Sequence, residues 1–313
     1  MIEAATWLTQ HHCDGVTIGI KELLHYQNKT GLLDLTPKLT IQAKLAGSYL
    51  AKTKGRGMEF DEARHYQQGD DIRAIDWRVT ARTGKTHTKL YREEKERPVF
   101  VLADMSSTMH FGTQLLFKSV QAAHLSSLIA WGAQQRGDRI GGIVFNQHQH
   151  REFKPYTRSK AVLSFLHGLM EFQQPQTSTT QFTFADACAR IRRLARPGSL
   201  IFLISDFENL DEVSKQHISR MSRHCEVMAY PISDPFEHAL PKVSIAQQVA
   251  LTDGKQTQQI VLGESKTEQQ YAEQHQQHFA RIEHMLKQCR CQVFPISAAL
   301  PLEQQMGGKP WTR

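Results

Sequence analysis

Four short apolar runs, separated by longer amphipathic stretches, constrain the fold of this chain more than any other feature. The runs are VFVLA (99–103), IGGIVF (140–145), LIFLIS (200–205) and CEVMAYPI (225–232). Each has the length of one strand and is continuously apolar, as expected of strands covered on both faces. The stretches between them carry apolar residues at helical spacing. Strands that alternate with helices predict an α/β fold with a doubly wound, mostly parallel sheet.

The order of the expected elements also divides the chain. A partly β-rich N-terminal segment (1–98) is expected to pack on an α/β domain (99–300). A loose tail (301–313) is expected to follow. Within the domain, the expected helices span 115–136, 159–172, 184–195, 210–223 and 264–288. A hairpin that turns at Asp253-Gly254 precedes the last helix, and a final strand follows that helix at 291–296.

A dense charged block, GDDIRAIDWRVTAR (69–82), lies near the end of the N-terminal segment. Alternation in IDWRVTA and in THTKLYRE predicts a hairpin that turns at Thr83-Gly84-Lys85. The charges are compatible with a general acid/base pair, with a docking surface for a partner, or with Arg–Asp pairs that clamp the hairpin onto the α/β domain. We favour the clamp, with Trp77 as its apolar anchor, because no nucleophile lies nearby in the sequence.

Two acids directly follow apolar runs: Asp104 follows the first, and Asp206 follows the third. Because ligands of doubly wound sheets bind outside the carboxyl ends of the strands, we expect both carboxylates in one crevice. Ser106 and Thr108 follow Asp104 at spacings of two and four, so their hydroxyls can turn back toward it. Carboxylates, hydroxyls and water suit Mg²⁺ or Mn²⁺. The alternative is that both acids only cap the helices that follow them.

The spacing D-x-S-x-[ST], with a later Thr and a later Asp, resembles the metal-ion-dependent adhesion site of von Willebrand factor type A domains. In that family, the carboxylate of a partner protein completes the coordination of the metal. More narrowly, the chain resembles the bacterial domain-of-unknown-function 58 family over about residues 40–235. The matching stretches are GRGMEFDEARHYQQGDDIRAIDWRVTARTGK, KLYREEKE, VLADMSSTMHFG, GDRIGGIVF and RPGSLIFLISDF.

This resemblance implies a partner as well as a site. Members are commonly encoded beside MoxR-type AAA+ ATPases and are thought to assist that ATPase in maturing or remodelling client proteins. The implied metal set is Asp104, Ser106, Thr108, a Thr of the middle loop, and Asp206. Thr108 stands where the family pattern has Ser. For the middle loop we favour Thr180, with Thr183 as the alternative, because Phe182 occupies the position where register places the Thr.

Composition excludes several classes of protein. Five cysteines, of which only Cys289 and Cys291 are close in sequence, argue against a disulfide framework, so we expect a reduced, cytoplasmic protein. No window holds the roughly 18 apolar residues of a membrane span. Many family members carry membrane helices, but this chain resembles the shorter, soluble ones, which would meet a membrane only through partners. The net charge of +7 is not gathered into a basic run, so we expect no nucleic-acid partner.

We therefore expect a non-catalytic protein-binding module that depends on Mg²⁺, and not an enzyme. One alternative is a scaffold with a vestigial metal site. Another is a metal-dependent hydrolase that uses Asp104 and Asp206 with a metal-bound water, for which the sequence offers no convincing base. A transition-metal site at HHCD (11–14) is not favoured, because neighbouring residues of a helix point apart and no further ligands are evident.

Overall fold

The computed structural model describes residues 4–36, 58–93, 96–173, 181–241, 243, 247–252 and 257–306 of the 313-residue chain. Contacts between residues divide the chain into two compact units, one formed by residues 1–45 with 97–313 and the other by residues 46–96. The N-terminal helices therefore belong with the α/β sheet. The domain boundaries expected at residues 98 and 300 remain predictions.

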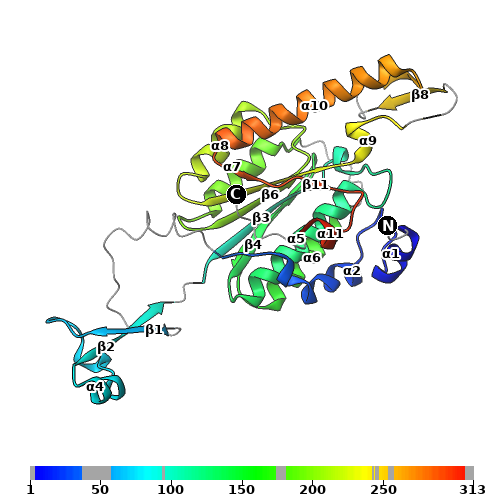
Figure 1. Ribbon diagram of the computed structural model, residues 1–313. Coiled ribbons are helices and arrows are strands. Elements are labelled where there is room, and N and C mark those ends of the chain that lie inside the picture. Colours follow the sequence, from blue (N-terminus) through cyan, green and yellow to red (C-terminus); the bar gives the residue numbers. More distant parts are fainter. Residues whose placement is uncertain are drawn as a thin grey trace. The chain divides into compact units, whose positions relative to one another are not determined.

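The larger unit is built on a seven-stranded sheet (Figure 1). Its strands are β3 (Pro98–Asp104), β4 (Arg139–Phe145), β5 (His150–Tyr156), β6 (Leu200–Ser205), β7 (Glu226–Ser233), β10 (Gln292–Val293) and β11 (Ile296–Ser297). Their order is β10-β7-β6-β3-β4-β5, and β11 also pairs with β7. Within this sheet as described, β4 and β5 pair antiparallel and the other pairs are parallel. The predicted α/β fold with a doubly wound, mostly parallel sheet is confirmed.

The strand order contains one point at which the chain changes direction across the sheet. From β3 the chain proceeds outward through β4 to β5, and it then returns to the other side of β3 and proceeds through β6, β7 and β10. Strands β3 and β6 are therefore neighbours, with Val99 opposite Leu200 and Ala103 opposite Ile204. Ligands of open α/β sheets bind at such a switch point, outside the carboxyl ends of the strands. The topology thus places a candidate site where β3 and β6 end.

Helices cover both faces of the sheet and enclose two separate hydrophobic cores (Figure 1). The first face carries α1 (Ala4–His11), α2 (Ile20–His25), α5 (Lys118–Gln135) and α6 (Ser159–Glu171). The second face carries α7 (Phe184–Leu194), α8 (Glu212–Met221) and α10 (Ser265–Gln288). Helix α5 is buried from Lys118 to Ala133, because the sheet contacts one side of it and α2 and α6 contact others. A helix surrounded in this way can place polar side chains in the interior.

The smaller unit contains an antiparallel strand pair and a short helix between the strands. Its elements are β1 (Met58–His65), α4 (Trp77–Thr83) and β2 (His87–Glu93). The predicted hairpin is therefore wrong in its first strand, because IDWRVTA enters a helix. Asp76 accepts hydrogen bonds from the amides of Arg78 and Val79 (3.0 and 3.1 Å) at the start of α4, and Gly84, with φ of 70°, ends it. These two caps outweigh the apolar–polar alternation.

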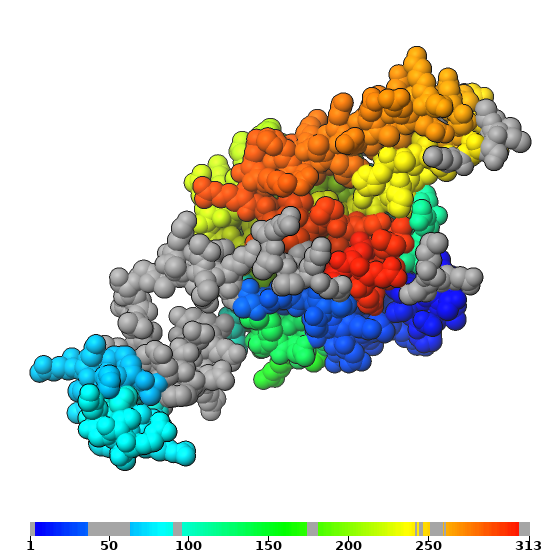
Figure 2. All heavy atoms as spheres, in the orientation of Figure 1, coloured from blue at the N-terminus to red at the C-terminus, as the bar shows by residue number. Residues whose placement is uncertain are grey.

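The C-terminal part of the chain departs from expectation in two places. The strand expected at 291–296 is divided into β10 and β11, with Pro295, which has no amide hydrogen, between them. Beyond them, α11 (Leu302–Met306) buries Leu302 and Met306 in the core beneath α5, so these residues are not a loose tail. Figure 2 shows this C-terminal segment, in red, beside the blue N-terminal helices.

Strands β8 (Gln247–Thr252) and β9 (Thr257–Leu262) form the hairpin expected before α10. The turn residues Asp253 and Gly254 lie outside the described part of the chain. A short helix, α9 (Pro235–His238), follows β7. Among the described helices, none combines the length and the apolar character needed to cross a membrane.

Candidate metal centre at the ends of β3 and β6

The switch point brings together two of the predicted site residues. Asp104 is the last residue of β3, and Asp206 follows Ser205, the last residue of β6. Because Ala103 lies opposite Ile204, the two acids lie on neighbouring strands at the same edge of the sheet. Asp104 exposes 1% of its surface and Asp206 exposes 2%. Two buried carboxylates therefore lie close together at this edge of the sheet, as the strand-end argument predicts.

Hydrogen bonds fix the carboxylate of Asp104. Its Oδ1 accepts a hydrogen bond from the amide of Ser106 (2.9 Å), and its Oδ2 accepts one from the hydroxyl of Ser205 (2.6 Å). Burial, followed by the negative charge of Asp206, raises the pKa of Asp104 to about 6, although the hydrogen bonds from Ser205 and Ser106 act in the opposite direction. Burial is the larger of the two causes, and the second shows that the charges of Asp104 and Asp206 repel each other.

The two hydroxyls predicted to bind the metal lie next to each other. A 3₁₀ turn at Ser107–Met109 brings Oγ of Ser106 within 3.2 Å of Oγ1 of Thr108. Neighbouring ligands of an octahedral Mg²⁺, each about 2.1 Å from the ion, are separated by about 3 Å. The spacing of the hydroxyls therefore fits two adjacent positions around such an ion.

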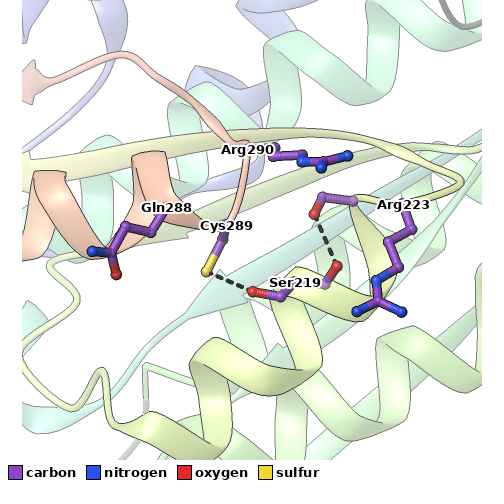
Figure 3. A pocket seen from close by; sticks show the side chains of 6 residues that line it. Ser219, Arg223, Gln288, Cys289 and Arg290 are labelled. Carbon is purple, nitrogen blue, oxygen red and sulfur yellow. Dashed lines mark hydrogen bonds between the residues drawn. The ribbon is translucent and has the colours of Figure 1, made fainter.

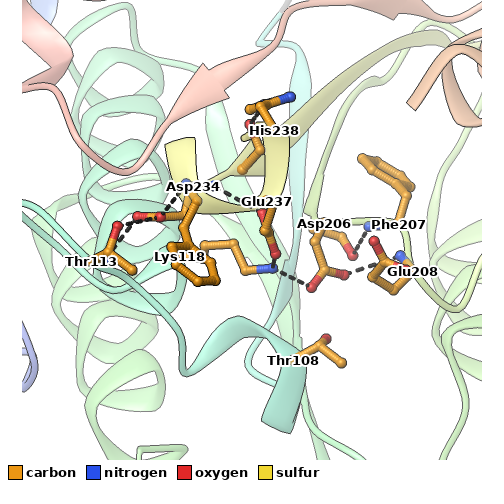
Figure 4. Close-up of polar contacts among 12 residues, drawn as sticks. Thr108, Thr113, Lys118, Asp206, Phe207, Glu208, Asp234, Glu237 and His238 are labelled. Carbon is orange, nitrogen blue, oxygen red and sulfur yellow. Dashed lines mark hydrogen bonds and ion pairs between the residues drawn. The ribbon is translucent and has the colours of Figure 1, made fainter. Parts of the chain in front are cut away.

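A buried lysine, which no sequence pattern marks as a site residue, lies beside these acids (Figure 4). Lys118 begins α5, and its ammonium lies 3.0 Å from Oδ2 of Asp206 and 2.5 Å from Oε1 of Glu237. Burial acts to lower the pKa of Lys118, but the charges of Asp206 and Glu237 together outweigh it and raise the pKa. Lys118 is therefore a charged, fully enclosed cation. In the sequence it is an unremarkable lysine at a helix start, where an exposed residue is the usual case.

Negative charge exceeds positive charge among the buried side chains around Lys118. Lys118 supplies one ammonium group. The carboxylates that face it or one another are those of Asp104, Asp206 and Glu237. Glu208 lies beside them and pairs with His278 (3.0 Å), and burial raises the pKa of Glu208. Because buried charges need partners, this excess favours either a bound cation or a retained proton. The donor set and the charge both fit Mg²⁺ or Mn²⁺.

A further buried acid, Asp234, connects the loop before α5 with Glu237. It accepts hydrogen bonds from both the amide (2.9 Å) and the hydroxyl (2.5 Å) of Thr113, in the loop before α5. Asp234 also caps α9, and its own amide donates to Oε2 of Glu237 (2.9 Å). This reciprocal capping holds the Glu237 carboxylate in place for its ion pair with Lys118. Strand β7 thus contributes to the site through the loop that follows it (Figure 4).

The predicted Thr of the middle loop is not placed beside these residues. Thr180, the favoured candidate, lies outside the described residues. Thr183 caps α7: its hydroxyl accepts a hydrogen bond from the amide of Asp186 (3.1 Å) and donates one to Oδ2 of the same residue (2.7 Å). The Thr183 hydroxyl is therefore engaged in a capping box. The fifth ligand, like the metal-binding role of the other four residues, stays a prediction.

The charged block of the smaller unit is organised by local contacts. Arg64 donates to Oδ1 of Asp70 (2.7 Å), and Asp76 caps α4. Trp77 exposes 67% of its surface, so it is not an apolar anchor within its own unit. The clamp between this block and the α/β domain, and the alternative of a docking surface, stay predictions.

A surface pocket lies at the other end of the strands (Figure 3). It has a volume of about 440 Å³ and lies where α8 and α10 end, just before β7 and β10 begin. Arg223 and Arg290 contribute to its lining, and the hydroxyl of Ser219 donates to the sulfur of Cys289 (3.2 Å). The pocket is lined by none of the predicted site residues, so it is separate from the candidate metal centre.

The strand order, the antiparallel edge strand and the acids at the switch point define a von Willebrand A-like α/β protein. The chain belongs to the family described as "Protein of unknown function DUF58", whose profile matches residues 62–281. The family predicted from the sequence is thus confirmed.

Several known proteins are similar to this chain. Uncharacterized protein Mb1516 of Mycobacterium bovis and uncharacterized protein Rv1480 of Mycobacterium tuberculosis are each 29% identical to it over 211 residues, which is 67% of this chain. The match spans 66% of the length of these relatives.

Solved structures with similar chains include BatB from Bacteroides thetaiotaomicron, with 15% identity and a TM-score of 0.36 over 62% of this chain and 98% of BatB. The SpRpn10 VWA domain has 11% identity and a TM-score of 0.36 over 68% of this chain and 94% of that domain. The strand order, and not these likenesses, carries the fold assignment.

Proposed function

We propose that this protein is a non-catalytic protein-binding module whose strand-end site holds Mg²⁺ or Mn²⁺ and binds a carboxylate of a partner protein. The observation that carries the proposal is the excess of buried carboxylates beside two hydroxyls at the spacing of adjacent metal ligands. Asp104, Ser106, Thr108 and Asp206 would hold the ion. When bound, the ion would supply one open position for an oxygen ligand of the partner.

Charge balance supports one divalent ion at this site. Asp104, Asp206 and Glu237 together carry three negative charges when ionised, and Lys118 carries one positive charge. A divalent ion would therefore balance the charges of these three carboxylates and Lys118. Ser205 and the amide of Ser106 would keep the Asp104 carboxylate oriented toward the ion.

The engagement of the two strand-end acids supports a binding role over a catalytic one. Both oxygens of Asp104 accept hydrogen bonds, one from Ser106 and one from Ser205. Oδ1 of Asp206 accepts from the amide of Glu208 (3.1 Å), and Oδ2 pairs with Lys118. A general base needs an oxygen within reach of a substrate or water proton. Turnover of generic phosphate or ester substrates that is lost in Asp206→Ala would replace this proposal with the hydrolase alternative.

We further propose a MoxR-type AAA+ ATPase as a partner, with client proteins matured or remodelled in the cytoplasm. Membership in the DUF58 family supports the partner through the resemblance described above. The five cysteines, all free thiols, support a reducing compartment. The proposed site would bind a carboxylate group, which most proteins carry, so it does not identify the client proteins.

A scaffold with a vestigial metal site is the second candidate, and Lys118 favours it. The ammonium group of Lys118 already supplies a cation beside Asp206 and Glu237. In such a scaffold the Asp104 carboxyl, because its pKa is raised, would retain a proton at low pH. No divalent ion would then be needed for folding or for binding.

Thermal unfolding in EDTA, with Mg²⁺ or Mn²⁺ titrated back, separates the two candidates. An ion that binds only the folded protein raises the unfolding midpoint by mass action. We expect this rise in the wild type and in Ser107→Ala, a matched control whose side chain is exposed in the same turn, but not in Ser106→Ala. If neither ion changes the unfolding midpoint of the wild type, the result favours the scaffold.

Partner binding is tested separately by capture of the purified MoxR-type ATPase with and without EDTA. We expect capture by the wild type and by Ser107→Ala in Mg²⁺, and loss of capture in EDTA or in Ser106→Ala. Capture that is equally strong under all four conditions would contradict a metal-dependent interface.

A further inference from the structure

A cluster of metal-ligating side chains lies beneath the N-terminal helices. Cys13 follows α1, Glu22 lies on α2 and His124 lies on α5. The sulfur of Cys13, a carboxylate oxygen of Glu22 and a ring nitrogen of His124 all lie within 4.8 Å of one another. The side chains of Glu22 and His124 are each only 1% exposed. Packing of α2 against α5 thus brings sulfur and oxygen ligands from the N-terminal segment together with a nitrogen ligand about 100 residues later.

Two of these ligand atoms are buried without a hydrogen-bond partner. They are Oε2 of Glu22 and Nε2 of His124, and they lie 3.6 Å apart. This distance exceeds the range of about 2.7–3.2 Å for an N–H···O hydrogen bond. It is close to the separation of about 3.3 Å between two ligands of a tetrahedral zinc ion with bonds of about 2.0 Å. Unpaired buried polar atoms are rare, and an ion between these two atoms would satisfy both.

The other polar atoms of Glu22 and His124 orient the unpaired ones. Oε1 of Glu22 accepts a hydrogen bond from the amide of Gly19 (2.6 Å), which leaves Oε2 directed toward His124. Nδ1 of His124 is hydrogen-bonded to the buried hydroxyl of Tyr26 (3.2 Å). When Nδ1 is the donor in this bond, Nε2 carries a lone pair. Metal-ligating histidines are usually held in this way.

Cys13 completes the set with a sulfur ligand. The amide of Gly15 donates to its Sγ (3.3 Å), which places the side chain beside Glu22. Burial, followed by a hydrogen bond with Glu22 and the charge of that carboxylate, raises the pKa of the Cys13 thiol, so a bound cation would be needed to deprotonate it. Sulfur, imidazole and carboxylate together are typical ligands of Zn²⁺, whereas Mg²⁺ takes oxygen ligands.

We propose that Cys13, Glu22 and His124 form a site for Zn²⁺ or for a chemically similar ion such as Co²⁺. Three protein ligands leave the fourth position of a tetrahedron for water. The ion would join the segment after α1, helix α2 and helix α5, and would therefore fasten the N-terminal helices to the sheet layer. This site shares no residue with the strand-end centre, so the two proposals can fail independently.

A neighbouring trio, His11, His25 and Glu303, is the alternative location for such an ion. The Nε2 atoms of His11 and His25 lie 4.0 and 3.8 Å from Oε1 of Glu303. These separations are longer than that between Glu22 and His124, and the three side chains are 14–35% exposed. The trio also lacks a thiol. A signal specific to a thiolate ligand therefore distinguishes the two locations.

Titration of the purified full-length protein with Co²⁺ tests the proposal, because a thiolate ligand gives Co²⁺ a charge-transfer band in the near ultraviolet. We expect the wild type to develop this band with one equivalent of Co²⁺ and to lose it when Zn²⁺ displaces the cobalt. Cys13→Ser should abolish the band. Cys225→Ser, which removes a buried thiol in the other core, and Glu303→Gln should both retain it.

Glu22→Gln provides a second variant in case Cys13→Ser does not fold. Gln keeps an oxygen acceptor for the amide of Gly19 but is a much weaker ligand, so we expect Co²⁺ binding to weaken by at least about 10-fold. A wild type that shows no band, a band that persists in Cys13→Ser, or an unchanged affinity in Glu22→Gln would overturn the proposal. So would loss of metal in Glu303→Gln alone, because it would place the ion at the neighbouring trio.

Discussion

The ammonium group of Lys118 lies 3.0 Å from Oδ2 of Asp206, and the two side chains are 1% and 2% exposed. The first residue of α5 thereby contacts the acid that follows β6, at the point where the chain reverses its direction across the sheet. Helix α5 is therefore part of the strand-end site as well as a cover for one face of the sheet. Removal of this cation should affect the whole fold.

Lys118→Met leaves Asp206 and Glu237 buried without their shared cation. We expect the free energy of unfolding in EDTA, measured with urea, to fall by about 3–5 kcal/mol, as when one partner of a buried ion pair is removed. Lys215→Met is the control, because Lys215 pairs with an exposed Glu212 (3.2 Å) and such pairs contribute only about 0–1 kcal/mol. Equal losses in the two variants would show that Lys118 is not a needed counter-charge.

Asp104→Asn should stabilise the protein at neutral pH in EDTA. Because the pKa of Asp104 is raised to about 6 in the folded state, folding favours the protonated carboxyl over the carboxylate. The protonated carboxyl therefore stabilises the folded protein relative to the carboxylate. This stabilisation is full below about pH 4 and is lost as the pH rises through about 6. Near neutral pH the loss is on the order of 3 kcal/mol, and Asn avoids it because it does not ionise.

Urea unfolding of the wild type and Asp104→Asn at several pH values checks this prediction. The two unfolding free energies should approach each other at acid pH and separate above about pH 6. A difference that is the same at every pH would mean that Asp104 does not titrate where its environment indicates.

Thr183→Ala should destabilise the protein without affecting its response to metal. Loss of the hydroxyl removes the cap of α7, for which we expect about 0.5–2 kcal/mol, measured by urea unfolding. Thr183→Ser, which keeps the hydroxyl, should lose much less. A Mg²⁺-dependent rise in the unfolding midpoint that disappears in Thr183→Ala would instead make this residue the missing ligand.

Gly142→Ala should disrupt the pairing of β3 with β4. A Cβ at this position would lie 2.1 Å from the backbone oxygen of Val101, its partner on β3. Because the close atom is backbone in a central strand, we expect a loss of about 1–3 kcal/mol or more. Gly31→Ala, which meets no atom within 4 Å, should change stability by less than about 0.5 kcal/mol. A comparably small effect at Gly142 would contradict this packing.

The strands and the meeting of the two acids could be predicted because each depends on a local pattern combined with a general rule. The apolar run at 200–205 coincides with β6, and parallel pairing then carries Asp104 and Asp206 to one edge. The helix at 77–83 could not be predicted from alternation, because its position depends on the caps at Asp76 and Gly84. There, local hydrogen bonding outweighed hydrophobic periodicity.

The remaining site residues could not be found because no local pattern marks them. Lys118 follows the predicted metal-binding loop in sequence, yet only the packing of α5 brings its ammonium group to Asp206 and Glu237. The HHCD run was set aside because its neighbours point apart, and they do: His11 joins one cluster and Cys13 another. Partners as distant in sequence as His124 and Glu303 become visible only when the helices have packed.

The position of α11 has a consequence for the synthesis of this chain. Helices α1 and α2 are synthesised before α5, on which they pack, and long before Glu303 of α11, against which they lie. The apolar surfaces of Trp7 and Leu23 therefore stay uncovered until those later helices have been made. The N-terminal helices can therefore complete their packing only after α11 has been synthesised.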